Sequence, residues 1–258
     1  NAEHVVVKHV NGKIFKLSHE KFIKFVKKDK IAITKAKALF SQKTKGIIPK
    51  IVDKLYTQRV EFRDAMDKSR LELSKLDTSD PSYRDKKFES ETFWVKQYTV
   101  KILINSIYGY FGNKYAPLGD SDIARSITLT GQAVIKQSNK ILYEYIKNLT
   151  GNDNLRLEDV IKYNDTDSSY ISIKSINDHF NQPLCENGKI ADTTYKTAQD
   201  IEKHLNKEIT SWASRTLNSH DPRFVFKREC IADVGMFLEK KRYVLHVLDD
   251  EGIPVNKF

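Results

Sequence analysis

Hydrophobic residues recur at helical spacing through residues 51–73, at steps of four and seven along the chain. That spacing places them on one stripe of a helix with 3.6 residues per turn. Residues 46–49, Gly-Ile-Ile-Pro, precede the stripe and suit a loop followed by a first helical turn. We therefore predict a long helix that ends near residue 75. The stripe consists of Ile51, Leu55, Phe62, Met66 and Leu73.

A second long helix is predicted directly after the first. Residues 76–82 are rich in Asp, Ser, Thr and Pro, which favour a turn, and a helical pattern then runs from about residue 86 to about residue 110. The two helices form a predicted αα-hairpin. Residues 121–148 and 197–217 predict further helices, and residues 19–40 form a lysine-rich amphipathic stretch.

Strand patterns occupy the two ends of the chain. Residues 4–10 and 13–17 predict a β-rich start, and residues 224–226 and 243–247 predict closing strands. Between them, residues 155–173 contain two apolar stretches around a polar turn at 164–168, which is typical of a β-hairpin. Helices combined with antiparallel hairpins predict an α+β fold.

Positive charge is concentrated at the N-terminal end. Residues 1–75 contain 19 basic and 8 acidic residues, whereas the remainder is nearly neutral. Such a field suits a polyanionic partner such as nucleic acid or a nucleoside triphosphate, although a solubilising lysine-rich surface gives the same pattern.

Cysteine usage and hydropathy narrow the class of protein. Cys185 and Cys230 form no C-x-x-C pair, which argues against a disulfide framework and a cysteine zinc site. No apolar run of 18 residues and no signal peptide pattern is present. We therefore expect a cytoplasmic protein without membrane association.

The most acidic candidate site is Asp165-Thr166-Asp167 in the predicted hairpin turn. On an extended backbone two carboxylates at this spacing leave the same side and can share a hard cation such as Mg²⁺. A calcium loop is excluded because its glycine and glutamate positions hold Tyr170 and Ile176. Aspartates that only bind backbone amides in a turn remain the alternative.

Three basic patterns are candidates for phosphate binding. Lys101, Asn105 and Tyr108 share one face of the second helix, where they can hold a phosphate, read a base edge and contact a sugar. Arg59 and Arg63 are one turn apart on the first helix. Taken in isolation, both groups are more often ordinary surface charges and core residues than a binding site. The run Lys240-Lys241-Arg242-Tyr243 suits either phosphate contacts or protection of a sheet edge.

Taken together and in this order, the motifs resemble family B DNA-directed DNA polymerases, in particular those of T-even-type phages. Residues 101–109, K-I-L-I-N-S-I-Y-G, are similar to the fingers motif of the family. Residues 163–168, Y-N-D-T-D-S, are similar to its palm hairpin, and residues 240–243 to its primer-terminus motif. Residues 46–49 with Gln58-Arg59 resemble the entry to the first fingers helix, so the likeness spans about residues 46–246.

The resemblance implies template-directed transfer of a nucleotide from a dNTP to a primer 3′-hydroxyl with two Mg²⁺ ions. It implies a basic palm-linked lead-in at residues 1–45, a fingers hairpin at 46–113 and the carboxyl half of the palm at 114–258. The implied partners are primer-template DNA, dNTPs and a sliding clamp. The implied site residues are Arg59, Arg63, Lys101, Asn105 and Tyr108 for the dNTP, Asp165 and Asp167 for metal and catalysis, Gly109, Lys240, Lys241, Arg242 and Tyr243 for DNA, and Glu229 as a further palm carboxylate.

Three departures from the family pattern bear on these expectations. Asn164 replaces a glycine before the first hairpin aspartate, and asparagine imitates glycine well at positive φ. Arg63 stands where related phage enzymes carry lysine, which keeps the charge. The other palm motif, an aspartate leading into S-L-Y-P-S, is absent from the 258 residues.

The missing motif leads to two hypotheses. In the first, an upstream polymerase segment or partner chain supplies that aspartate and the exonuclease domain, and this chain alone is inactive. In the second, the chain is a non-catalytic DNA- or nucleotide-binding module, or a degenerate polymerase subunit.

Overall fold

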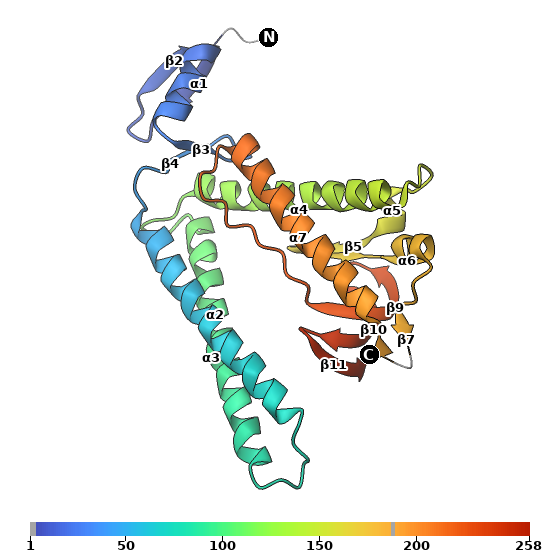
Figure 1. The fold of residues 1–258 in the computed structure, drawn as a ribbon. Helices are drawn as coiled ribbons and strands as arrows, with labels where there is room; N and C mark the ends of the chain where they lie inside the picture. Colours follow the sequence, from blue (N-terminus) through green and yellow to red (C-terminus); the bar gives the residue numbers. More distant parts are fainter. Residues whose placement is uncertain (1–3, 187–188) are drawn as a thin grey trace. The chain divides into compact units, whose positions relative to one another are not determined.

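The computed structural model describes residues 4–186 and 189–258, which form two compact units. One unit comprises residues 41–126, and the other comprises the described residues on both sides of that segment. The elements are labelled in Figure 1. Among the residues that the structure describes, no helix is long and apolar enough to cross a membrane.

The unit of residues 41–126 is built on an antiparallel pair of long helices, α2 (Ile47–Leu73) and α3 (Tyr83–Gly112) (Figure 1). The predicted αα-hairpin is thus confirmed. Near the connecting loop, Lys86 Nζ lies 2.6 Å from Glu72 Oε2 across the pair. Further along, Lys96 lies over the Phe62 ring at 5.7 Å. Both contacts hold the two helices in one register.

The chain starts with a small ββα arrangement in the other unit. Strands β1 (His4–Lys8) and β2 (Ile14–Ser18) pair antiparallel, and α1 (His19–Lys28) follows directly. Helix α1 covers only ten residues of the amphipathic stretch, because Lys30 at φ 49° turns the chain into β3 (Ile31–Ile33). Strand β4 (Leu39–Ser41) pairs with β3.

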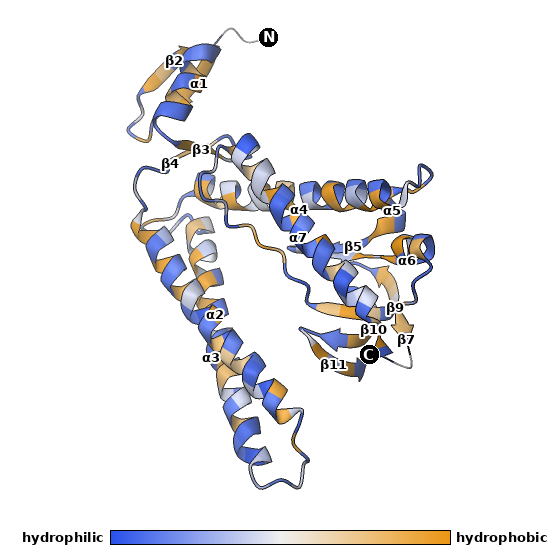
Figure 2. Cartoon of the chain, in the orientation of Figure 1, coloured by the Kyte–Doolittle hydropathy of each residue, from blue (hydrophilic) through white to orange (hydrophobic). Residues whose placement is uncertain are grey.

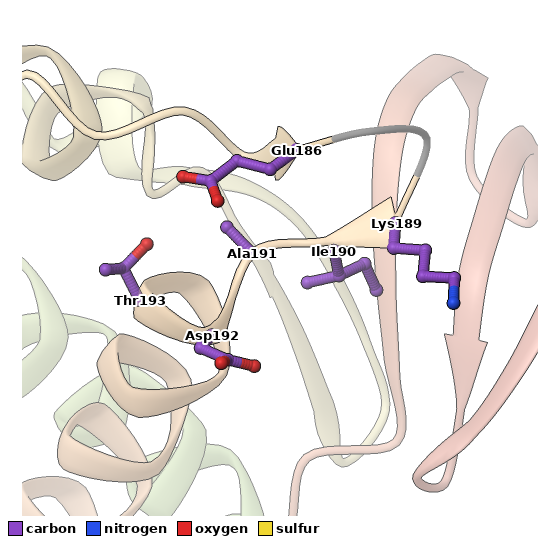
Figure 3. Close-up of a pocket in the computed structure, with 6 residues that line it drawn as sticks. All are labelled: Glu186, Lys189, Ile190, Ala191, Asp192 and Thr193. Atoms are coloured by element: carbon purple, nitrogen blue, oxygen red, sulfur yellow. The ribbon is translucent and has the colours of Figure 1, made fainter.

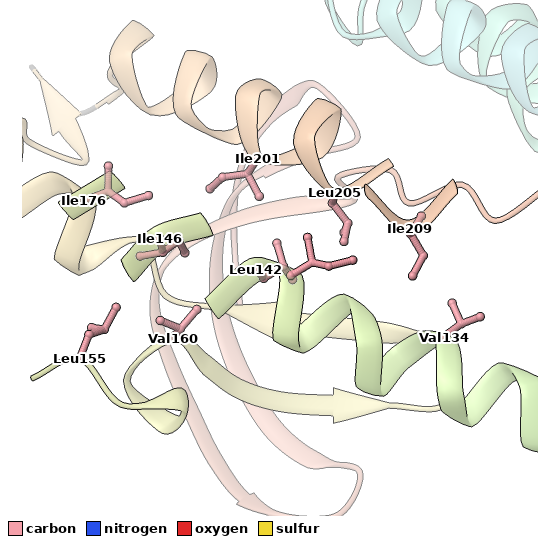
Figure 4. Packing of buried hydrophobic residues seen from close by; sticks show 10 residues of the cluster. Val134, Leu142, Ile146, Leu155, Val160, Ile176, Ile201, Leu205 and Ile209 are labelled. Carbon is pink, nitrogen blue, oxygen red and sulfur yellow. The ribbon is translucent and has the colours of Figure 1, made fainter. Parts of the chain in front are cut away.

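The hydrophobic core of this unit lies between two long helices and the strands beside them (Figure 4). Helix α4 (Ser121–Thr150) and helix α7 (Asp192–Leu217) carry apolar residues at helical spacing, and both helices were expected from that spacing. The short helices α5 (Leu157–Val160) and α6 (Lys174–Phe180) complete the core. Its buried members are Val134, Ile141, Leu142, Ile146, Leu155, Val160, Ile176, Ile201, Leu205 and Ile209.

All paired strands with a described register are antiparallel. Strands β5 (Ile161–Asp165) and β6 (Ser168–Ile171) form the predicted hairpin, and β7 (Cys185–Glu186) pairs with β8 (Lys189–Ile190). Strands β9 (Cys230–Glu239), β10 (Arg242–Asp250) and β11 (Ile253–Lys257) form a sheet in the order β11-β10-β9. The α+β class is confirmed, and the strand expected at 243–247 lies in β10.

The strand predicted at residues 224–226 is absent from the described structure. Asn206 on α7 occupies the hydrogen-bonding groups that a neighbouring strand would use. Its amide donates to the Phe226 carbonyl at 2.7 Å and accepts from the Phe226 N–H at 2.8 Å. Phe224 and Phe226 pack against the core, so their apolar character reflects burial without sheet pairing.

A buried carboxylate anchors the far end of β10. Asp249 is fully buried, and its Oδ1 pairs with Arg228. It also accepts from the Gly252 N–H at 3.0 Å and from the Tyr195 hydroxyl at 3.1 Å. Burial, followed by the bond to Asp249, raises the pKa of Tyr195. This network joins α7, the segment before β9 and the β10–β11 turn.

His246 is expected to make the stability of the C-terminal sheet depend on pH. Its ring nitrogens lie 2.8 Å from Asn256 Oδ1 and 2.7 Å from Asp233 Oδ1, and both bonds raise the pKa of His246 above its usual 6.5. A raised folded-state pKa means that the stabilisation is complete below the unfolded pKa and is lost as pH rises through the folded value. We expect His246 to titrate above 6.5 by NMR, and unfolding to become easier above that folded pKa.

The variant His246→Gln is the control for this prediction, because it should remove the pH dependence in that range. A titration midpoint at or below 6.5 would contradict the prediction.

Candidate functional site

The acidic motif lies at the tip of the β5–β6 hairpin. Asp165 ends β5 and pairs with Ser168, while Thr166 and Asp167 form the turn. The Asp167 N–H donates to the Asp165 carbonyl at 2.6 Å. The two aspartates therefore do not lie on one extended strand, as was predicted from their spacing, because Asp165 ends β5 and Asp167 lies in the turn.

The strained residue of this turn is Thr166. Its φ of 53° lies in the left-handed region, which β-branched residues rarely adopt. Asn164, which replaces the glycine of the family pattern, lies in β5 and is not among the residues at positive φ, and its Oδ1 accepts from Ser169 Oγ at 2.8 Å. Such strain persists only where the surroundings hold it, and it is frequent at functional sites.

The basic motif forms a second hairpin tip beside the first. Lys240 and Lys241 make the β9–β10 turn, with Lys241 at φ 63°. The Lys241 N–H donates to the Tyr163 hydroxyl at 2.6 Å, and its Nζ lies 4.0 Å from Asp165 Oδ1. Arg242 is exposed and pairs with Glu239 at 3.3 Å. Residues far apart in the sequence thus form one acidic and basic site.

Four aromatic rings from the strands of the two hairpins pack against one another. Neighbouring ring centroids of Tyr163, Tyr170, Phe237 and Tyr243 are 5.1–5.7 Å apart, and the hydroxyls of Tyr170 and Tyr243 are 2.7 Å apart. Burial, then the bond to Tyr243, raises the pKa of Tyr170. Of the four residues, only Tyr243 was assigned a role from the sequence. Each of the strands β5, β6, β9 and β10 contributes one of these aromatic residues, but the pattern within a strand does not show that the four rings meet.

The hydroxyl of Tyr163 is expected to hold the Lys241 turn. Replacing Tyr163 with Phe keeps the ring and removes the acceptor, at a cost of about 0.5–1.5 kcal/mol. Amide hydrogen exchange should show faster exchange at Lys241. Tyr143→Phe is the control, because that hydroxyl donates to the Leu155 carbonyl instead. An unchanged rate of amide hydrogen exchange at Lys241 in Tyr163→Phe would contradict the prediction.

The other cations of the predicted site, Arg59, Arg63 and Lys101, belong to the unit of residues 41–126. Arg59 and Arg63 are half-buried on α2, and their Nε atoms are buried without a hydrogen-bond partner among the described residues. The Phe62–Lys96 contact sets the antiparallel register, which places Arg59 within about one turn of Lys101 along the helix axes. Unpaired buried donors of a charged group are costly, so these two atoms are not satisfied within the described part of the chain.

The face of α3 that follows Lys101 is open to solvent. Lys101 and Asn105 are exposed, and Tyr108 is 45% exposed. Tyr108 is therefore not a core residue. A Cβ built on Gly109 meets no atom within 4 Å. A cation, an amide and an aromatic ring are thus presented together on one accessible face.

Comparison with known proteins decides the family. The sequence model of DNA polymerase family B matches residues 4–251. The chain belongs to DNA polymerase family B. It is 28% identical over 209 residues to the DNA-directed DNA polymerase of Escherichia phage RB69, which covers 75% of this chain and 22% of that protein. It is 29% identical over 170 residues to that of Enterobacteria phage T4, covering 58% and 18%.

One further viral sequence and one solved structure are also similar to the chain. The DNA polymerase beta of African swine fever virus is 28% identical over 127 residues, covering 49% of this chain and 10% of that protein. A family B DNA polymerase structure from Pyrobaculum calidifontis aligns with a TM-score of 0.40 at 18% identity, covering 85% and 21%. The chain spans about a fifth of the length of the phage relatives.

Family B polymerases are generally metal-dependent, and the β5–β6 hairpin tip offers two carboxylates. Asp165 is partly buried and Asp167 is exposed, and their oxygens suit Mg²⁺, which binds through one or two carboxylates plus waters and phosphates. Within residues 4–186 and 189–258, no group of three or more His, Cys, Asp or Glu is placed to hold a metal ion. Glu229 is exposed before β9, and only its carbonyl has a described bond, from the Glu251 N–H at 2.6 Å. The carboxylates of Asp165 and Asp167 can therefore supply part of the ligand shell of a Mg²⁺ ion.

Two surface hollows lie away from these family B motifs. One, of about 490 Å³, is lined by residues around the start of α7, including Glu186, Lys189 and Asp192 (Figure 3). The other, of about 320 Å³, lies between α2 and α3 and includes Arg70 and Trp94. Neither contains a residue of the acidic, basic or fingers motifs.

Proposed function

We propose that this chain forms the fingers and the carboxyl half of the palm of a template-directed DNA polymerase. Residues 46–113 act as fingers, residues 114–258 as palm and residues 1–45 as the palm-linked lead-in. The observation that carries the proposal is the meeting of Asp165 and Lys241 at two hairpin tips, in a chain that matches family B from residue 4 to residue 251.

The fingers cations bind the triphosphate of the incoming dNTP. Arg59 and Arg63 supply guanidinium donors, whose planar geometry matches phosphate oxygens, and Lys101 adds a point charge. Both arginines are half-buried on α2, and Arg59 lies within about one turn of Lys101 along the helix axes, which supports a shared role. Asn105 and Tyr108 contact the nascent base pair, and the exposure of their helix face leaves room for it.

The basic hairpin tip grips the primer strand. Lys240, Lys241 and Arg242 are exposed, and each carries a charge suited to a phosphate. Tyr243 is half-buried in the aromatic cluster, which fixes the direction of the turn. Gly109 lets DNA approach the α3 backbone closely, because no side chain stands there.

Asp167 and Asp165 hold Mg²⁺ at the acidic tip. When bound, two such ions stabilise the attacking and leaving oxygens of the in-line displacement. Lys241 faces Asp165 and leaves Asp167 as the more accessible carboxylate, so Asp167 is the principal ligand. Glu229 is assigned as a further palm carboxylate near this hairpin.

The aspartate preceding S-L-Y-P-S comes from an upstream segment or a partner chain. Two carboxylates compensate the charge of two divalent ions poorly, so this chain alone has negligible activity. Primer extension with Mg²⁺ is the test, with the chain alone and with the segment that carries the missing motif. Extension only in the combined reaction is expected.

A combined reaction that binds primer-template DNA yet never elongates it would overturn the catalytic proposal. That result would favour the alternative, a non-catalytic DNA- or nucleotide-binding module.

A further inference from the structure

Helix α1 presents four exposed lysines on one side. Lys21, Lys24, Lys27 and Lys28 fall within about 120° of one another on a helix of 3.6 residues per turn. We call these four residues the lysine face. Blue hydrophilic and orange hydrophobic residues alternate along α1 as this arrangement requires (Figure 2).

The opposite side of α1 is apolar and fixed in place. Val26 is buried, and Phe22 and Phe25 are half-buried. Asn218, at the C-terminal end of α7, donates its amide to the carbonyls of Val26 at 3.4 Å and Ile31 at 2.9 Å. The lysine face is therefore held on the folded unit and is not part of a loose basic tail.

Residues 4–30 carry more positive charge than is favourable for the stability of helix α1. Residues 4–30 contain eight lysines and two acidic residues, Glu20 and Asp29. Lys27 and Lys28 suit the negative end of the helix dipole, but Lys21 lies in the first turn, where a cation is unfavourable. Lys24 lies one turn from Lys21, Lys27 and Lys28, and such like-charge pairs each cost about 0.2–0.5 kcal/mol. A bound polyanion relieves this repulsion.

We propose that the lysine face binds the phosphate backbone of duplex DNA, as a contact outside the acidic and basic hairpin tips. The proposal rests on the proposed polymerase function, which supplies primer-template duplex as the partner. No aromatic ring lies on the lysine face for stacking of unpaired bases, which favours duplex over single strands. A helix of ten residues is about 15 Å long and spans roughly nine phosphate charges of a duplex.

Salt titration of duplex binding by the full chain tests the proposal. The variant carrying Lys21→Gln, Lys24→Gln, Lys27→Gln and Lys28→Gln keeps good helix formers and removes four charges. We expect the plot of log affinity against log salt to become shallower by up to about 3.6, or about 0.9 per lost phosphate contact. The matched control replaces four exposed lysines of α4 and α7 with Gln, namely Lys136, Lys140, Lys203 and Lys207.

Glu20 provides a test in the opposite direction. It lies within the lysine face and pairs with Lys24 at 2.5 Å, so Glu20→Gln should tighten duplex binding and steepen the salt dependence. This variant loses no lysine, which keeps the proposal testable if the fourfold variant folds poorly.

Three results overturn the proposal: a wild-type salt slope in the fourfold variant, an equal loss in the control set, or a larger loss on single-stranded DNA than on duplex. Primer extension in the combined reaction judges the polymerase function separately, because it depends on Asp167 and not on the lysine face.

Discussion

Replacing Asp167 with alanine is expected to lower primer extension in the combined reaction by at least about a hundredfold to a thousandfold, the usual loss for one preorganised electrostatic group. Asp167 is exposed in the β5–β6 turn, so the substitution removes a carboxylate without opening a cavity. Surface changes of this kind alter stability by about 0.5 kcal/mol or less. The lost activity would therefore report the lost ligand and not an unfolded chain.

Asp178→Ala is the matched control for Asp167→Ala. Asp178 is also an exposed aspartate of the same unit, on α6, where it pairs with Lys174 at 3.2 Å. Its replacement should leave extension unchanged. Both variants are measured by single-turnover extension of a labelled primer across a range of Mg²⁺ concentrations. Normal extension by Asp167→Ala would remove the hairpin from the catalytic assignment.

Replacing Asp249 with alanine is expected to destabilise its unit by about 3–5 kcal/mol, because it leaves Arg228 without its partner in a largely buried position. The Gly252 N–H and the Tyr195 hydroxyl lose their acceptor as well. Such a loss is a large fraction of the stability of an ordinary domain. Unfolding should therefore begin at β10, β11 and the N-terminal end of α7.

Urea unfolding followed by tryptophan fluorescence measures this loss. The two tryptophans lie in different units, Trp94 on α3 and Trp212 on α7, so a Trp94→Phe background reports only the unit that contains Asp249. Asp250→Ala is the control, since Asp250 pairs with Lys257 at the surface and should cost about 1 kcal/mol or less. Equal midpoints for the two variants would contradict the assigned role of the buried network.

The lysines of the lysine face and the lysine of the hairpin tip, Lys241, have different surroundings. At the tips, Lys241 has a carboxylate within 4.0 Å, and the cation and anion define a position for chemistry. On α1, Glu20 pairs with Lys24, and the four lysines of the lysine face are exposed. The positive net charge of the N-terminal end therefore comes partly from the lysine face, in addition to Arg59 and Arg63.

Local periodicity predicted the long helices α2, α3, α4 and α7, because each depends mainly on which residues lie one turn apart, but it did not predict the short helices α5 and α6. The stripe from Ile51 to Leu73 specified α2, and the turn chemistry before Pro81 separated α2 from α3. The strand predicted at residues 224–226 was wrong because Phe224 and Phe226 pack against the core without a neighbouring strand, and Asn206 takes both backbone hydrogen bonds of Phe226. Strand pairing is a tertiary property that a short apolar run does not encode.

For the candidate site, the sequence by itself determined the residue types and the family to which their order belongs. It did not determine that Lys241 reaches Asp165, that the Tyr163 hydroxyl accepts from the Lys241 N–H, or that Thr166 adopts positive φ. These features depend on the register of two hairpins distant in the chain and on the packing of four aromatic rings between them. Only the tertiary structure decides them, because the atoms involved become neighbours when the chain folds.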